Sequence, residues 1–345
     1  MIPRLSGTRP VNVGIVGCGN IAQVFHLPIL SRRRDVKIQA ISDLDLAKVA
    51  AVAEKFNIKN VYTDFAEMLQ QEDLEVLFVL TPNNMHLPMT LIALDQGLHV
   101  FVEKPAARNT REVERMAREA AAKDRVVMVG MQNRFRSDVK ALKKFIQDKE
   151  LGQLFFIKGG WLQARQQSFR QNWLYHTTVS GGGVLMDLGV QLIDLIWFLL
   201  DKPQVHSLKA VSFSMDNRKD VEDFCVCCFT FSNGVSFSLE VSWDFPLAKD
   251  RFFVELIGEK GTATLNPLNL QKVWHNQIVN IKPEISDSRF QFFKKGYENE
   301  VNHFMDYLKG RVKTLESPIE EAVAVHKMVD GIYQSIVNER ELLLD

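Results

Sequence analysis

Two different patterns of hydrophobic and polar residues divide the chain near residue 130. Before that point, short β-rich apolar runs alternate with stretches that have the spacing of amphipathic helices. Near-continuous apolar strands that alternate with helices imply a parallel sheet covered on both faces. The pattern therefore predicts a doubly wound α/β domain over residues 11–130. Its strands are expected at Val11–Val16, Lys37–Ser42, Val61–Thr63, Val76–Leu80, His99–Val102 and Val126–Val129, and its helices at Leu46–Phe56, His86–Gln96 and Thr110–Ala122.

After residue 130 the pattern changes to longer runs with β character and a few helical stretches. Ser232-Asn233-Gly234 carries the Asn-Gly hairpin signal, and Gly258-Glu259-Lys260-Gly261 has the composition of a second tight turn. Strands joined by hairpins are antiparallel, so residues 131–345 are expected to form an α+β domain with an open, mostly antiparallel sheet. Helices are expected at Ser137–Asp148, Val184–Leu200, Glu298–Leu308 and Ile319–Asn338, and strands at Leu154–Lys158, Val205–Ser214, Phe224–Phe231, Val235–Trp243, Phe252–Ile257 and Thr262–Leu265.

Large apolar residues alternate along the predicted hairpin Phe224–Trp243, among them Phe229, Phe231, Phe237 and Trp243. Helices of the second domain can cover one face of this sheet, but little sequence remains to cover the other. An uncovered apolar sheet face implies a partner, and identical chains are the usual partner. We therefore expect a homodimer or homotetramer joined face to face through this sheet.

Composition and charge exclude several classes of protein. The chain has 345 residues, and its 42 basic and 42 acidic side chains cancel to a formal net charge of zero. A balanced chain argues against a nucleic-acid binder and against a protein that binds anionic membranes. A hydrophobic content of 46% and a charged content of 24% are typical of a globular protein and exclude wholesale disorder.

The cysteines and the apolar runs indicate a cytoplasmic protein. Four cysteines are too few for a disulfide framework. Three of them lie in Cys225-Val226-Cys227-Cys228, where neighbouring side chains of a strand point to opposite faces and cannot all hold one metal ion. The first ten residues contain no signal peptide, and the longest apolar run, Leu195–Leu200, is far shorter than the ~20 residues that span a bilayer. We expect reduced cysteines, no metal site and no membrane partner.

The first predicted strand leads into a glycine-rich turn. Gly17-Cys18-Gly19-Asn20-Ile21-Ala22 fits the Gly-x-Gly-x-x-Gly/Ala pattern, in which glycines let a pyrophosphate approach the backbone and the helix that follows holds its charge. Asp43 ends the second strand, where a carboxylate can accept hydrogen bonds from ribose hydroxyls. No arginine or serine follows Asp43 to receive a 2′-phosphate, so NAD is favoured over NADP. The first domain is therefore expected to be a dinucleotide-binding Rossmann domain.

Two more polar groups follow strands of the same predicted sheet. Thr81-Pro82-Asn83-Asn84-Met85-His86 comes at the carboxyl end of the fourth strand, and Glu103-Lys104-Pro105 ends the fifth. Ligands of open α/β sheets bind at this edge. Spacing alone explains the first group equally well as a capped polar loop. A lysine at this edge can donate to substrate hydroxyls, and its pKa can be lowered by a bound nicotinamide and by burial.

Taken together, these motifs resemble the Gfo/Idh/MocA oxidoreductases. Gly17-x-Gly19-x-x-Ala22, Thr81-Pro82-Asn83-x-x-His86, Glu103-Lys104-Pro105 and Gly181-Gly182-Gly183-x-x-x-Asp187 occur in the order and at the spacing of that family. The resemblance implies a nicotinamide-dependent enzyme that oxidises or reduces hydroxyl carbons of sugars, cyclitols and sugar nucleotides. It also implies roles for single residues: Lys104 as the catalytic lysine, Asp187 as the acid that orients the substrate, and cofactor contacts at Gly17, Gly19, Asn20, Ile21, Asp43, Thr81, Pro82, Asn83, His86, Glu103 and Lys104.

The chain departs from the family pattern at Gln191. Members usually have histidine or tyrosine there, which can exchange a proton with the substrate hydroxyl, whereas a glutamine amide does not titrate. Gln191 can still hold a hydroxyl, and we include it with Lys104 and Asp187 in the catalytic group. The proton then passes through Lys104, through water, or through Tyr175 or His176 of the loop 163–180.

The same loop and its neighbours supply weaker candidates for substrate contacts. Trp161 and Trp173 could stack on a sugar face. Arg134, Arg165 and Arg170 could bind a carboxylate or a phosphate. Each of these residues is equally compatible with a role in packing or with a solvated surface position, and His176 alone more often marks a solvated connection.

The sequence thus predicts a cytoplasmic, NAD(H)-dependent dehydrogenase that acts on a sugar-like or cyclitol secondary alcohol or ketone. Two alternatives use the same fold: a non-enzymatic, NAD-dependent sensor or regulator, and a reductase of an unsaturated ring compound. The absence of a titrating group at Gln191 favours the sensor, and the retained Glu103-Lys104-Pro105 motif speaks against it.

Overall fold

The computed structural model describes residues 5, 9–165, 172–215, 220–285 and 292–344. Its contacts divide the chain into two compact units. The first consists of Met1–Gln132 and Tyr297–Val323, and the second of Asn133–Gly296 and Ala324–Asp345. We expected all of residues 131–345 in one domain, and no signal in the sequence indicated that Tyr297–Val323 returns to the first unit.

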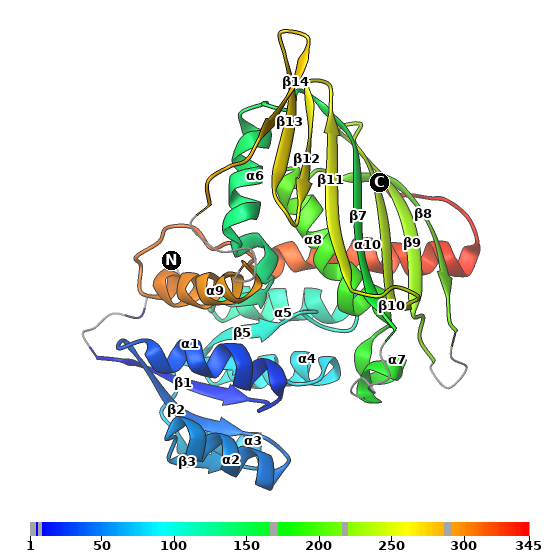
Figure 1. Cartoon of the computed structure of the whole chain (residues 1–345). Helices are drawn as coiled ribbons and strands as arrows, with labels where there is room; N and C mark the ends of the chain where they lie inside the picture. The colour runs from blue at the N-terminus through cyan, green and yellow to red at the C-terminus, as the bar shows by residue number, and fades with distance from the viewer. Residues whose placement is uncertain (1–4, 6–8, 166–171, 216–219, 286–291, 345) are drawn as a thin grey trace. The chain divides into compact units, whose positions relative to one another are not determined.

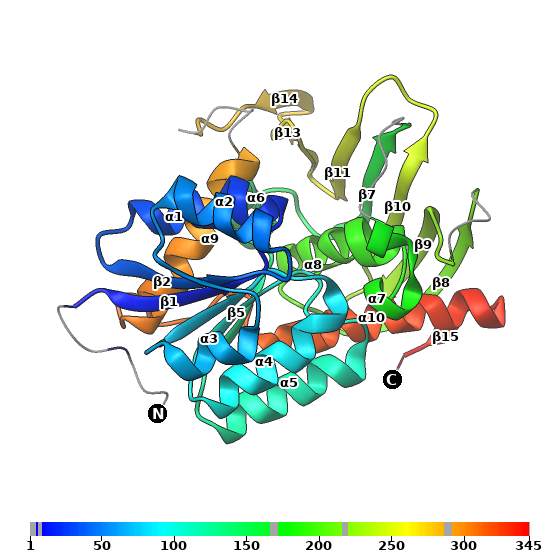
Figure 2. The same ribbon diagram turned by 90° about the horizontal axis from the view of Figure 1, so that it is seen from below.

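The first unit contains a six-stranded parallel sheet with helices on both faces, as the sequence predicts. Figure 2 shows α1 and α2 on one face and α3, α4 and α5 on the other. The strand order is β3-β2-β1-β4-β5-β6, so the order reverses between β1 and β4, where ligands of such sheets bind. The strands are β1 (Val11–Val16), β2 (Val36–Ser42), β3 (Asn60–Tyr62), β4 (Val76–Val79), β5 (His99–Glu103) and β6 (Val127–Gly130).

Polar side chains cap the starts of some helices of the first unit, whereas the helices that begin at Ala22, Leu27 and His86 have no side-chain cap. Asp45 accepts a hydrogen bond from the amide of Lys48, and Asn109 accepts one from the amide of Glu112. The glycine-rich turn opens into a π-helical segment that continues as a regular helix. The helices are η1 (Ala22–His26), α1 (Leu27–Arg32), α2 (Leu46–Phe56), α3 (Phe65–Gln71), α4 (His86–Asp95) and α5 (Thr110–Ala122).

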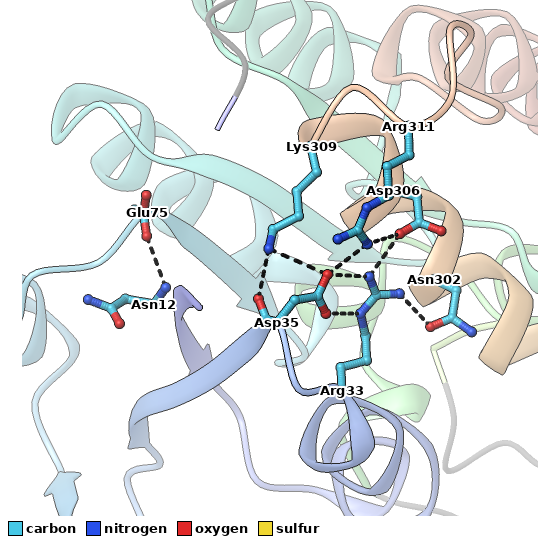
Figure 3. A network of polar contacts seen from close by, with 8 residues as sticks. All are labelled: Asn12, Arg33, Asp35, Glu75, Asn302, Asp306, Lys309 and Arg311. Carbon is cyan, nitrogen blue, oxygen red and sulfur yellow. Dashed lines mark hydrogen bonds and ion pairs between the residues drawn. The ribbon is translucent and has the colours of Figure 1, made fainter. Parts of the chain in front are cut away.

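The returning segment is bound to the first unit by rings and by charges. Phe304 of α9 (Phe292–Leu308) packs on Phe78 and Phe101 of the sheet. Figure 3 shows the charged network beside it, in which Asp35 lies within 3.4 Å of the side chains of Arg33, Lys309 and Arg311. Arg33 also donates to Asn302 at 2.7 Å and to Asp306 at 2.8 Å.

The charges of this network keep Asp35 ionised. Partial burial raises the pKa of Asp35, but the hydrogen bonds and positive charges of Arg33, Arg311 and Lys309 outweigh burial and hold that pKa well below its usual range. Asp35 therefore links the start of β2 to the returning segment through an ionised carboxylate.

The second unit contains a nine-stranded sheet in the order β14-β13-β12-β11-β7-β10-β9-β8-β15. All of its neighbouring pairs are antiparallel except β7 with β10, which confirms the open, mostly antiparallel sheet. The strands are β7 (Leu154–Ala164), β8 (Val205–Phe213), β9 (Phe224–Phe231), β10 (Ser236–Phe245), β11 (Arg251–Gly258), β12 (Gly261–Leu265), β13 (Asn269–Trp274), β14 (Gln277–Ile281) and β15 (Leu342–Leu343).

Helices cover one face of this sheet (Figure 1). They are α6 (Ser137–Gln147), η5 (Leu185–Gly189) with its continuation α8 (Val190–Leu199), and α10 (Ile319–Asn338); the short η4 (Asn172–Tyr175) and α7 (Thr177–Ser180) precede η5. The segment Thr177–Leu199 is long and apolar enough to cross a membrane by composition, but 94% of its most apolar window is buried, as in a core helix.

The aromatic residues on which we based self-association lie on the covered face. Phe229, Phe231, Phe237 and Trp243 are each at most 2% exposed within the single chain. The opposite face of β9 and β10 carries Val226, Cys228, Ser238 and Glu240, together with Phe224, whose ring packs on Phe213 of β8. The four aromatic residues named in the sequence analysis are therefore not part of an uncovered face. A homo-oligomer through this sheet stays a prediction, which now depends on edge residues such as Phe213, 59% exposed.

Candidate active site

The glycine-rich turn of the first unit leaves room for a ligand next to its backbone. Gly17 has φ +92°, and a Cβ there would lie 2.5 Å from the carbonyl oxygen of Leu80, so only glycine fits. A Cβ on Gly19 would meet no atom within 4 Å. Asn20 and Ile21 open the helix, whose first amides have no acceptor within the helix. The turn therefore fits a dinucleotide phosphate group held against the backbone at Gly19.

Asp43 connects this turn to the end of β2. Its Oδ2 accepts the amide of Cys18 at 2.8 Å, and its Oδ1 accepts the amide of Asp45 and the Nζ of Lys48, both at 3.0 Å. Burial raises the pKa of Asp43, but these hydrogen bonds lower it more, so the carboxylate is ionised. The sequence analysis did not single out Lys48, which lies in the first turn of α2 and forms an ion pair with Asp43.

His86 is a positioning residue rather than a surface group at the end of β4. Its ring is fully buried, and its two nitrogens lie 2.8 Å from the carbonyl oxygens of Pro105 and Thr81. Burial lowers the pKa of His86, against the effect of these carbonyls. His86 thus connects the turn after β4 to the turn after Lys104. The cofactor contact that the resemblance implies for His86 does not fit this geometry, whereas Thr81 and Pro82 are partly exposed.

Glu103 also faces the interior. Its Oε1 lies 2.6 Å from Nε2 of His26, and its Oε2 accepts the backbone amide of Lys104 at 3.1 Å. His26 is fully buried and contacts the rings of Phe78 and Phe101. The carboxylate therefore fixes the main chain at Lys104, which is partly exposed. Sequence reasoning missed His26, because a histidine on the buried side of a helix has no distinctive spacing.

The second unit holds Asp187 from both sides. Its Oδ2 accepts the indole Nε1 of Trp243 at 2.9 Å, and its carbonyl oxygen accepts the side-chain amide of Gln191 at 3.0 Å. Tyr175 packs edge-on against the Trp243 ring, with ring centroids 6.1 Å apart. Gln191 is 4% exposed, so in this structure it supports the π-helical turn of η5 beneath Asp187.

The residues proposed as weaker substrate contacts differ in their burial and in their contacts. Arg134 is 1% exposed, binds Asp194 with two nitrogens and lies over the Phe198 ring, so its guanidinium holds the core and cannot bind substrate. Trp161 packs on Phe252 and Phe293. His176 is exposed and Trp173 is partly exposed. The guanidinium of Arg165 lies 3.9 Å from the carboxylate of Asp244. Arg170 is outside the described residues.

The candidate residues therefore form two groups. In the first unit, parallel pairing brings the ends of β1, β2, β4 and β5 to one edge of the sheet, with Gly17, Asp43, Thr81 and Lys104 at those ends. In the second unit, Asp187, Gln191, Trp243 and Tyr175 contact one another.

Comparisons with known proteins match both parts of the chain to family models. Residues 11–131 match the family model described as "Oxidoreductase family, NAD-binding Rossmann fold", and residues 139–264 match the one described as "GFO/IDH/MocA C-terminal domain". These matches cover most of the chain and confirm the resemblance that the motifs indicated.

Curated relatives and solved structures are similar to this chain over much or nearly all of its length. The chain is 26% identical over 346 residues to the D-glucoside 3-dehydrogenase of Escherichia coli (strain K12), covering 95% of this chain and 96% of that protein. It is 24% identical over 262 residues to the scyllo-inositol 2-dehydrogenase (NADP(+)) of Bacillus subtilis (strain 168), covering 75% and 77%. Its fold is similar to the WlbA dehydrogenase from Bordetella pertussis in complex with NADH and UDP-GlcNAcA, with a TM-score of 0.86 at 20% identity over 99% of both chains.

Proposed function

The chain belongs to the Gfo/Idh/MocA oxidoreductase family, and from that premise we propose that it transfers a hydride between NAD(H) and a secondary alcohol or ketone of a sugar or cyclitol. The names of relatives support the substrate class, since they act on a D-glucoside and on scyllo-inositol. Binding of NADH by a protein of the same fold supports the cofactor.

The first unit has the residues that would hold the dinucleotide. The backbone at Gly17–Ile21 would take the pyrophosphate, and the ionised Asp43 would accept hydrogen bonds from ribose hydroxyls while repelling a 2′-phosphate. Thr81 and Pro82 lie at the neighbouring strand end, where the partly exposed turn can line the rest of the cofactor. When bound, NAD supplies the hydride acceptor, and NADH the donor.

Lys104 carries the proposal, because its main chain is fixed by the buried Glu103 carboxylate at the sheet edge that bears the dinucleotide turn. In the oxidation, the Lys104 side chain would take the proton of the substrate hydroxyl, and in the reduction it would return a proton to the substrate oxygen. Asp187 would orient the hydroxyl with its carboxylate. The side chain of Gln191 does not titrate, and it already donates a hydrogen bond to the backbone carbonyl of Asp187. A proton route through Lys104 does not require a titrating side chain at position 191.

A two-part screen tests this function. The protein is incubated with NAD and a panel of methyl glucosides, inositols, levoglucosan and UDP-sugar acids, and both its thermal stability and the absorbance of reduced nicotinamide are measured. We expect at least one compound both to stabilise the protein and to reduce NAD. Stabilisation by NAD and a sugar with no reduction in any pair, in either direction, would instead support the sensor alternative.

A further inference from the structure

The Gly181-Gly182-Gly183 turn is closely packed against two residues that no motif includes. A Cβ on Gly182 would lie 1.9 Å from the hydroxyl oxygen of Tyr333, and a Cβ on Gly183 would lie 1.9 Å from the backbone oxygen of Glu222. Both distances are far shorter than van der Waals contact. These glycines are therefore required by the close approach of Tyr333 and Glu222.

Glu222 accepts the first hydrogen bonds of the helical segment that carries Asp187. Its Oε1 accepts the amides of Gly183 at 3.2 Å and Leu185 at 3.0 Å, and its backbone oxygen accepts the amide of Val184 at 3.0 Å. The first amides of a helix have no acceptor inside the helix, and here one residue supplies acceptors for three in a row. Asp187 lies in the turn that follows, where its amide donates to the carbonyl of Gly183 at 3.1 Å.

The residue after Glu222 supports the carboxylate side of Asp187. The backbone oxygen of Asp223 accepts the amide of Trp243 at 2.9 Å, and the indole of Trp243 donates to Asp187. The dipeptide Glu222-Asp223 is thus connected to the main chain of Asp187 on one side and to its carboxylate on the other. Both connections pass through hydrogen bonds between buried or half-buried groups.

Tyr333 of α10 holds the Glu222 side chain in this orientation. Its hydroxyl donates to Oε1 of Glu222 at 3.0 Å. Burial, with the adjacent Glu222 carboxylate, raises the pKa of Tyr333 well above its ordinary value, so the hydroxyl keeps its proton and donates. A cavity of about 390 Å³ opens beside the pair, lined in part by Gly181, Ser212 and Ser214.

We propose that Glu222 and Tyr333 are positioning residues for Asp187. This role rests on the proposed function, in which Asp187 orients the substrate hydroxyl. Glu222 fixes the start of the helical segment, and Tyr333 fixes Glu222. Loss of either contact lets Asp187 move relative to Trp243 while the fold persists, because the sheet and the rest of α8 pack without them.

The indole N–H of Trp243 reports this geometry without any substrate. In protein labelled with ¹⁵N-tryptophan, the five tryptophans give separate indole signals, and Trp243→Phe identifies the relevant one. Spectra are compared for wild type, Glu222→Gln, Tyr333→Phe and Asp187→Ala. Trp197 is an internal control, because its indole donates to the carbonyl of Pro203 at 2.9 Å, away from this cluster. Glu240→Gln makes the same chemical change on the opposite face of β10 and is the matched control.

We expect the Trp243 signal to move in both Glu222→Gln and Tyr333→Phe toward its position in Asp187→Ala, while the Trp197 signal stays in place. Glu240→Gln should move neither signal. A Trp243 signal that keeps its wild-type position in both folded variants would overturn the proposal. Tyr333→Phe removes one oxygen atom only, so it keeps the test valid if Glu222→Gln does not fold.

Turnover gives the second arm once the panel has supplied a substrate. Glu222→Gln should lower kcat/KM about tenfold in the wild-type background and less than about twofold in the Asp187→Ala background, because residues that act through one another are not additive. NADH affinity should be unchanged in both. Equal losses in both backgrounds would contradict the positioning role. If the wild type turns over no compound, the proposed function fails, while the indole spectra still decide whether Glu222 and Tyr333 hold Asp187.

Discussion

Lys104 in the first unit and Asp187 in the second are supported in different ways. The supports of Lys104 are themselves motif residues: Glu103 binds its amide, and His86, from the motif after β4, binds the carbonyl of Pro105. The supports of Asp187 come from strands and a helix far along the chain, namely Glu222, Trp243 and Tyr333. A sequence motif can therefore identify a functional residue without identifying the residues that fix its position.

Several motif residues also contact other parts of the protein rather than open space. Glu103 and His86 are buried and bind neighbouring protein groups. At positions 182 and 183 only glycine leaves enough room for Tyr333 and Glu222. In both units only part of each motif faces space that a ligand can occupy. The following predictions separate residues that act on ligands from residues that hold them.

Replacing Lys104 should give the largest effect on turnover. Lys104→Ala removes the proposed acid–base group and should lower turnover by about 10²–10⁴-fold, the loss expected for general acid–base catalysis. NADH affinity should stay near normal, because the dinucleotide turn is built from other residues. The check is steady-state turnover together with a fluorescence titration of NADH. Wild-type turnover by Lys104→Ala would shift the proton route to Tyr175 or His176.

Substitution of Gly17 should mainly lower stability, whereas substitution of Gly19 should mainly weaken NADH binding. Gly17→Ala combines a positive φ with a Cβ 2.5 Å from a backbone oxygen and should lower the free energy of unfolding by about 2–4 kcal/mol. Gly19→Ala meets no atom within 4 Å and should change stability by no more than about 0.5 kcal/mol. Its added methyl group should instead weaken NADH binding. Urea unfolding and NADH titration of both variants check this, and equal stability losses would remove Gly19 from the ligand surface.

The ion network around Asp35 should make stability fall in acid. The pKa of Asp35 is lowered in the fold, so its carboxylate adds stability that is complete well above the unfolded pKa of about 3.9 and is lost as pH falls below it. Asp35→Asn should lower the free energy of unfolding by about 1–3 kcal/mol at pH 7 and by less at pH 3. Arg9→Ala, which removes an exposed ion pair with Glu75, should change it by less than about 1 kcal/mol. A gap between wild type and Asp35→Asn that widens at pH 3 would contradict this assignment.

The sequence allowed the fold to be predicted well, because hydrophobic periodicity decides which segments become strands and helices. The helices Leu46–Phe56, Thr110–Ala122 and Ile319–Asn338 have the predicted bounds. The hairpin of β13 and β14 was missed, since Val273, Trp274 and Ile278 are exposed and give no clear alternation between buried and solvated faces.

The sites were harder to predict, because contacts between distant segments leave no local pattern. Arg134 pairs with Asp194, sixty residues away, and nothing around either residue signals the pair. Trp243 was placed on an open sheet face, although alternation alone cannot decide which face the helices cover. Glu222 precedes a strand as an ordinary polar residue, and only the fold brings it to the Gly181–Gly183 turn.

Replacing Gln191 should cost much less than replacing Lys104. Gln191→Ala removes one uncharged hydrogen bond to the carbonyl of Asp187, which should cost about 0.5–1.5 kcal/mol in transition-state stabilisation or in stability. Gln191→His should keep or raise activity if its ring reaches the substrate, and should have little effect if position 191 only supports the turn. Turnover and thermal unfolding of both variants check this. A loss for Gln191→Ala as large as that for Lys104→Ala would contradict the division of roles.

A further prediction concerns the choice of cofactor at Asp43. The carboxylate should make NADH bind more tightly than NADPH by about 1–3 kcal/mol, the range expected for a close charged contact. Lys48 pairs with Asp43 and can partly offset the repulsion of a 2′-phosphate, so Lys48→Ala should widen the preference by about 0.5 kcal/mol. Fluorescence titration of both cofactors checks this. Equal affinities in the wild type would remove Asp43 from this role.

The most direct test of the central claim follows the hydride itself. Ring-deuterated methyl glucoside, scyllo-inositol and levoglucosan are each incubated with NAD and a stoichiometric amount of protein, and the recovered cofactor is analysed by mass spectrometry. We predict that at least one compound transfers one deuterium to the cofactor with the wild type, and that transfer with Lys104→Ala is slower by about 10²–10⁴-fold. Cofactor and sugar that bind together without any transfer of deuterium would contradict the claim and identify the chain as a sensor.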